Sequence, residues 1–129
     1  MALPPDERIV IVLPFPPSSN SAYPSGKNGR RFMSKAGAAW KLAAYPMATS
    51  SLGDWLAPEC IMMSFWLAFP DKRKRDLNNY VKLPQDLVCE AWGIDDNHFM
   101  IPEIRMISMG VNRANAHCRI EIVSVHRKD

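Results

Sequence analysis

The stretch from Cys60 to Phe69 reads C-I-M-M-S-F-W-L-A-F and is closed by Pro70. It is apolar almost throughout, alternates little and has the length of a strand, so it predicts a central strand buried on both faces. The run from Arg8 to Leu13, R-I-V-I-V-L, is rich in β-branched residues and is followed by Pro14, which predicts a second strand entering a rigid turn.

A first helix is expected between these two strands. Ser34 can cap its N-terminus, and apolar residues at helical spacing continue to about Ala48. Pro46 is expected to kink this helix or to end it early. The preceding segment 18–29 predicts a loop, and the following segment 49–58 predicts a connector. The apolar face of the helix is expected to carry Trp40, Ala43, Ala44 and Met47.

A second helix is expected from Leu77 to about Ala91. Asp76 is placed to cap this helix, and Gly93 is placed to stop it. Pro84 lies inside the helical segment, so we expect it to bend the helix or to delay its first regular turn.

Two strand-like runs, 104–109 and 118–125, finish the chain, and the segment 110–116 between them predicts a hairpin loop. The order β-α-β-α-β-β predicts a small α+β fold in which helices pack on one mixed sheet. A chain of 129 residues can bury one hydrophobic core, so we expect a single domain spanning residues 1–129.

The composition excludes several classes of protein. An apolar fraction of 47% with 22% charged residues is typical of a soluble globular protein. The N-terminus lacks the pattern of a signal peptide, and no apolar run approaches the ~20 residues that cross a bilayer. The widely spaced Cys60, Cys89 and Cys118 argue against zinc binding and predict free, buried thiols in a reducing compartment. We therefore expect a cytoplasmic protein with no membrane partner.

Charge is concentrated locally, although the formal net charge is only +3. Four consecutive cations lie between Asp71 and Asp76, and the pair Asp95-Asp96 follows after one helix length. Cations bind phosphates and carboxylates bind divalent metals, so their interleaving predicts a metal-dependent nuclease. The clustered basic residues are Lys72, Arg73, Lys74 and Arg75 in one group and Lys27, Arg30, Arg31 and Lys35 in another.

Each of these features also has a simpler explanation. Asp76, taken alone, is better explained as a helix cap. The segment 95–97 fits an ordinary Asx turn, and most charge runs are solvated edges. Carboxylates at the two ends of a helix of about fifteen residues are ~22 Å apart, so they meet only if the turn folds back or a second subunit supplies one. Their coincidence with the cations at one strand–helix junction favours the nuclease.

The segment 70–79, P-D-K-R-K-R-D-L-N-N, together with Lys82, Asp86 and Asp95-Asp96, resembles the signature of the RusA family of Holliday junction resolvases. The opening segment 13–20, L-P-F-P-P-S-S-N, is similar to the N-terminal region of that family, so the resemblance covers nearly the whole chain. It implies a phage or prophage endodeoxyribonuclease of DNA recombination and repair. Such an enzyme is a homodimer that binds four-way junction DNA and cuts two strands symmetrically with Mg²⁺.

The resemblance also implies roles for individual residues. Asp76 and Asp96 match the catalytic, metal-binding aspartates, with Asp95 beside the latter, and Lys82 matches the lysine of the catalytic helix. The family pattern D-L-D-N reads D-L-N-N here, so Asn78 stands at a metal-binding position where an aspartate is expected. The residues expected to bind DNA phosphates are Lys72, Arg73, Lys74, Arg75, Lys27, Arg30 and Arg31.

Asn78 leaves two functions open. An amide oxygen can ligate Mg²⁺, but it brings no negative charge and cannot take a proton. Asp71 or Asp95 is a candidate to compensate for the missing carboxylate. The chain is therefore expected to be a working junction resolvase, or a catalytically weak or silent junction-binding protein of the same fold. An RNA-binding or unrelated structural domain remains only if the motif match is due to chance.

Overall fold

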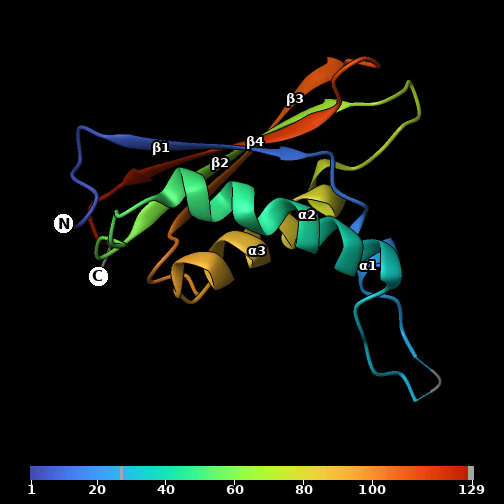
Figure 1. The fold of residues 1–129 in the computed structure, drawn as a ribbon, viewed down its shortest axis with the longest axis horizontal. Coiled ribbons are helices and arrows are strands. Elements are labelled where there is room, and N and C mark those ends of the chain that lie inside the picture. The colour runs from blue at the N-terminus through green and yellow to red at the C-terminus, as the bar shows by residue number, and fades with distance from the viewer. Residues whose placement is uncertain (27, 128–129) are drawn as a thin grey trace.

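The computed structural model describes residues 1–26 and 28–127 and forms a small α+β domain, as expected (Figure 1). Its elements are β1 (Arg8–Pro14), α1 (Ser19–Ala22), α2 (Lys35–Leu52), β2 (Ile61–Phe69), the 3₁₀ helix η1 (Leu77–Tyr80), α3 (Lys82–Trp92), β3 (Glu103–Val111) and β4 (His117–Ser124). The short helix α1 lies in a segment that was expected to be a loop, and η1 occupies the beginning of the expected second helix.

In the described part of the chain, one mixed four-stranded sheet has the order β1-β4-β2-β3. β2 pairs with β3 in parallel, and β4 pairs antiparallel with both β1 and β2. The expected hairpin of the last two strands is therefore wrong, because β4 inserts between β1 and β2. The chain passes the end of β2 on its way from β3 to β4, where the Asn112 amide donates to the Phe69 carbonyl at 2.8 Å.

Burial explains this placement of the last two strands. Cys118, Ile120 and Ile122 of β4 are fully buried, whereas β3 exposes most of its residues. An alternating strand with a fully buried face suits the middle of the sheet, and an exposed strand suits its edge. β2 also lies inside the sheet, as its apolar sequence predicts.

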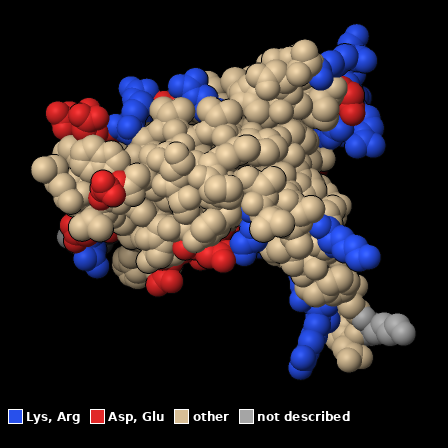
Figure 2. All heavy atoms as spheres, viewed as in Figure 1, with Lys and Arg blue, Asp and Glu red and all other residues tan. Residues whose placement is uncertain are grey.

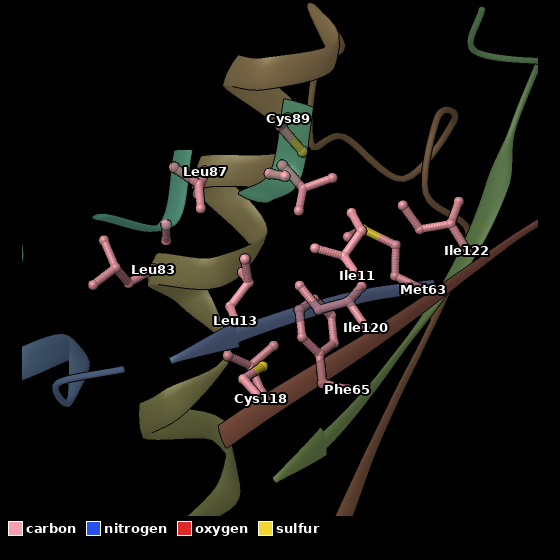
Figure 3. Close-up of a cluster of buried hydrophobic side chains, with 14 of the residues drawn as sticks. Ile11, Leu13, Met63, Phe65, Leu83, Leu87, Cys89, Cys118, Ile120 and Ile122 are labelled. Atoms are coloured by element: carbon pink, nitrogen blue, oxygen red, sulfur yellow. The ribbon is translucent and has the colours of Figure 1, made fainter. Parts of the chain in front are cut away.

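Helices α2 and α3 pack against each other and lie over one face of the sheet (Figure 1). Figure 3 shows Leu83 and Leu87 of α3 beside the side chains of β1, β2 and β4. The labelled sheet residues in this core are Ile11, Leu13, Met63, Phe65, Cys118, Ile120 and Ile122. Burial of this shared apolar surface is the main force that holds α3 on the sheet.

The first long helix differs from its expected form in length and orientation. α2 continues through Pro46 to Leu52, so residues 49–52 belong to the helix and not to a connector. Ala43 and Met47 are exposed, contrary to expectation. The proline costs a backbone hydrogen bond, but the buried face continues beyond it and keeps the helix intact. That face consists of Gly37, Trp40, Ala44, Ala48 and Leu52.

The helix ends follow local signals in most cases. Ser34 caps α2, since its Oγ accepts from the Gly37 amide at 3.1 Å. Gly93 ends α3 in a left-handed conformation at φ 71°. The regular helix begins only at Lys82, which agrees with the delay expected from Pro84 in its first turn. Asp76 was expected to cap this helix with its side chain. Asp76 does stand at the N-cap position, of η1, but within the described residues its side chain makes no capping bond there.

Cys60, Cys89 and Cys118 are buried and free, as predicted. Among residues 1–26 and 28–127, no helix has both the length and the apolar character that crossing a bilayer requires.

Candidate nucleic-acid and metal site

The loop between β2 and η1 is held in shape by an ion pair. Arg75 donates to both carboxylate oxygens of Asp71, at 2.7 and 3.0 Å. The Arg73 backbone amide donates to the same carboxylate at 2.9 Å. These bonds lower the pKa of Asp71 to about 2, and the side-chain bond from Arg75 makes the largest contribution. The Asp71 carboxylate is thus occupied by the loop itself.

Arg75 differs from its three basic neighbours. Its side chain is only 7% exposed. The guanidinium lies 6.0 Å from the ring centroid of Phe15 and 5.9 Å from that of Phe69. Arg75 therefore stabilises the loop between β2 and η1, and its charge is compensated by Asp71.

The remaining cations of the loop, Lys72, Arg73 and Lys74, are exposed. With Ser108 and Gly110 of β3, they line a hollow of about 280 Å³. Arg73 also borders a second hollow, of about 490 Å³, which is lined on its other side by Pro16 and Pro17. The exposed side of the loop thus presents adjacent positive charges beside two concave surfaces.

A second basic element projects from the body of the molecule. We call residues 24–26 and 28–33 the arm. It is a narrow hairpin-like segment joined by the bridge between Ser25 and Arg31, and the Phe32 amide donates to the Pro24 carbonyl at 3.2 Å. Arg30 and Arg31 are exposed on it. Lys27, the third residue expected to bind DNA here, lies outside the described residues.

Basic side chains concentrate at the end of the molecule from which the arm and the 70–76 loop project (Figure 2). Acidic side chains in this view lie mainly along the opposite end and the lower edge. A phosphate backbone would be attracted to the basic end and repelled by the acidic one.

The expected metal-binding residues lie at two separate places. Asp76 and Asn78 are exposed just before α3, whereas Asp95 and Asp96 are exposed just after it. The 11 residues of α3 correspond to ~16 Å, and Figure 1 shows the two ends of the helix well apart. Within residues 1–26 and 28–127, no group of three or more His, Cys, Asp and Glu side chains could hold a metal ion.

Backbone bonds cap the C-terminus of α3. The Ile94 amide donates to the Cys89 carbonyl at 2.9 Å. The pKa of Cys89 is raised to about 12, mainly by burial and further by the charges of Asp96, Asp86 and Asp95.

Lys82 lies in the first turn of α3, and its Nζ is 3.5 Å from Asp86 Oδ2. Tyr23, at the end of α1, donates its hydroxyl to the same Oδ2 at 2.9 Å. Sequence reasoning missed Tyr23. No local pattern indicates this contact, because 63 residues separate the tyrosine from its partner.

No protein-family model matches this chain, and no curated protein matches its sequence.

Proposed function

We propose that this protein is a Mg²⁺-dependent, structure-selective endodeoxyribonuclease that resolves four-way junction DNA in recombination and repair. The observation that carries the proposal is the sequence of exposed side chains in the loop between β2 and η1 and at the start of η1. There the exposed cations 72–74 are followed, after the mostly buried Arg75, by the exposed side-chain oxygens of Asp76 and Asn78. The resemblance of the same residues to the RusA signature supports the choice of substrate.

The DNA-binding surface combines the 70–76 loop with the arm. Lys72, Arg73 and Lys74 would bind phosphates of one junction arm without reading its sequence. Arg30 and Arg31 would extend the contact to phosphates further away, because the arm projects from the body (Figure 1). Arg75 contributes indirectly, by keeping the loop in the conformation that exposes its neighbours.

The donor atoms around Asp76 fit a hard metal ion. The Asp76 carboxylate is exposed and not engaged as a helix cap, and the exposed Asn78 amide lies two residues further on. Mg²⁺ commonly takes only one or two protein carboxylates and keeps several waters. Asp76, Asn78 and Asp96 would hold the ion, which when bound polarises the scissile phosphate and lowers the pKa of a bound water. Lys82 would stabilise the negative charge that develops on the phosphate.

A homodimer accounts for the separation of the carboxylates. Asp76 and Asp96 of one chain lie at opposite ends of α3, so a second copy can bring the missing carboxylate to each site. A two-fold dimer would also present two equivalent sites to a junction of near two-fold symmetry, which paired symmetric cleavage requires.

A cleavage assay tests the proposal. The full chain is incubated with a labelled synthetic four-way junction, with Mg²⁺ or with EDTA, and with linear duplex of the same sequence as control. Cleavage should require Mg²⁺, should prefer the junction and should fall on opposing strands. Intact junction after prolonged incubation with wild type would contradict the proposed nuclease.

A second candidate function is a junction-binding protein with little or no cleavage. Asn78 favours it, because one expected charge is missing from the metal site. Asp71, one of the two candidates to compensate, already accepts bonds from Arg75 on both of its oxygens, which further favours this function. Tight junction binding by a wild type that does not cleave would support this second function.

A further inference from the structure

Two side chains from distant parts of the sequence converge on one oxygen of Asp86. The Tyr23 hydroxyl donates to Oδ2 at 2.9 Å, and the Lys82 Nζ lies 3.5 Å from the same atom. The ammonium also lies 5.8 Å from the centroid of the Tyr23 ring. Lys82 is thus bordered by a carboxylate on one side and by an aromatic ring on the other.

Backbone contacts fix the position of Tyr23. Its amide donates to the Ser19 carbonyl at 2.8 Å, and the Ser34 amide donates to the Ala22 carbonyl at 2.8 Å. Gly37 of α2 packs so closely on this turn that an added Cβ would lie 3.1 Å from the Ala22 carbonyl oxygen. The backbone of Tyr23 is therefore held by α1 and α2, whereas its hydroxyl bonds to Asp86 of α3.

The same region is tied to the candidate metal site. Ser19 Oγ donates to the Asn79 carbonyl at 3.0 Å, which joins α1 to η1 one residue after Asn78. Lys82 follows η1 after one residue, Val81. The contacts of α1 thus connect the segment that carries Asp76 and Asn78 with the first turn of α3.

A lysine on an exposed helix turn is normally mobile. The lysine side chain has a flexible stem of four carbons. In water, a single ion pair to a residue four positions along the helix holds its ammonium only weakly. Here the Lys82 side chain is 55% exposed and the Asp86 side chain 32% exposed. The hydroxyl of Tyr23 fixes the carboxylate, and the fixed carboxylate restricts the ammonium to one side of α3.

We propose that Tyr23 and Asp86 are positioning residues that hold the Lys82 ammonium for contact with the phosphate bound near Asp76. This inference rests on the proposed function. Tyr23 and Asp86 act through Lys82 and do not themselves touch the DNA.

A double-mutant cycle tests the positioning role. Tyr23→Phe removes the hydroxyl and keeps the ring, and Asp86→Asn removes the charge at nearly constant shape. Each should lower the single-turnover cleavage rate at saturating junction by roughly 3- to 10-fold, with junction affinity changed less than about twofold. In a Lys82→Ala background, neither should lower the rate further, because residues that act through one group are not additive. The dissociation constant for the junction is measured for the same set of variants.

Glu90→Gln is the matched control. Glu90 lies on the same helix and forms an ion pair with Lys41 of α2. Its loss should leave cleavage unchanged, provided that thermal unfolding shows a folded protein. Equal losses from Tyr23→Phe in the wild-type and Lys82→Ala backgrounds would overturn the positioning role, since they would show a merely structural contact.

A second measurement does not depend on cleavage. Burial and the bond to Asp86 raise the pKa of Tyr23 above its ordinary value. Asp86→Asn should therefore lower that pKa, as measured by the phenolate absorbance difference between each protein and its Tyr23→Phe counterpart. An unchanged titration would overturn the inference even if wild type cleaves junctions. A lowered pKa in a chain that cleaves nothing would support the Tyr23–Asp86 contact, but it would contradict the proposed nuclease and overturn the positioning role with it.

Discussion

Arg75 binds both carboxylate oxygens of Asp71, four residues earlier, at 2.7 and 3.0 Å. This bidentate pair closes the loop and places residues 72–74 on its outer side. Of four consecutive cations, one is used to build the loop and three are exposed. The two kinds of cation should therefore respond differently to mutation.

The exposed cations should set the salt dependence of junction binding. Replacing Lys72 and Lys74 together by Ala removes two phosphate contacts, so the slope of log affinity against log salt should flatten by about one to two units. Titrations of a labelled junction between low and physiological salt measure this slope.

The matched control removes two charges elsewhere. Arg8 and Arg105 have side chains 66% and 61% exposed and lie on β1 and β3. The Arg8→Ala/Arg105→Ala variant should keep the wild-type slope. Equal flattening in both variants would show that only net charge matters, and an unchanged slope in the loop variant would remove this loop from the DNA surface.

The Asp71–Arg75 pair should make stability depend on pH in the acid range. The pKa of Asp71 is lowered from 3.8 to about 2 in the folded protein. A lowered folded-state pKa gives stability that is present above 3.8 and is lost as the pH falls toward 2. Asp71→Asn should thus lower the melting temperature at pH 5 to 7, and the difference from wild type should shrink below pH 4. A constant difference down to pH 2 would contradict the pair.

The buried face of α3 should dominate the stability of the domain. Leu87 is 1% exposed in the core, whereas Leu42 on α2 is 80% exposed. Leu87→Ala should lower the free energy of unfolding by about 2–5 kcal/mol, and Leu42→Ala should change it by less than about 0.5 kcal/mol. Urea unfolding curves of the two variants measure the contrast. Similar losses in both would mean that α3 does not pack on the sheet as described.

The local signals in this sequence predicted the structure well. Ser34 and Gly93 act within a few residues of themselves, and both helix ends lie where these residues indicate. The apolar run of β2 also predicted its inner position. Such features depend on the immediate sequence, so a single chain is enough to find them.

The failures concern relations between distant segments. The partner strands of β4 depend on which face of each strand the helices cover, and the short spacing after β3 favoured a hairpin that does not form. Likewise, the buried face of α2 includes Ala48 and Leu52 and not Met47, because the sheet determines which side of an evenly apolar helix is covered. The contact of Tyr23 with Asp86 belongs to the same class.

The proposed homodimer is tested by sedimentation velocity at micromolar concentration, with and without junction DNA. In the proposed shared site, Asp96 of a second copy joins Asp76, because the two lie at opposite ends of α3 in one chain, so a dimer is expected at least in the presence of the junction. A monomer in both conditions would contradict the shared site.

The last prediction concerns Asn78. Asn78→Asp adds a charged oxygen beside Asp76, and a charged ligand binds a hard dication better than an amide does. Cleavage in limiting Mg²⁺ should therefore rise on the order of tenfold.

Asp76→Asn and Asp96→Asn should each lower cleavage by about 100-fold or more and retain junction binding, because loss of a negative charge does not weaken the attraction to phosphates. Asp54→Asn is the control, because it removes an exposed carboxylate after α2 without touching the proposed metal ligands or the loop between β2 and η1. Wild-type cleavage rates in both Asp76→Asn and Asp96→Asn would place the active site elsewhere, whereas cleavage seen only in Asn78→Asp would identify the natural chain as a silent junction-binding protein.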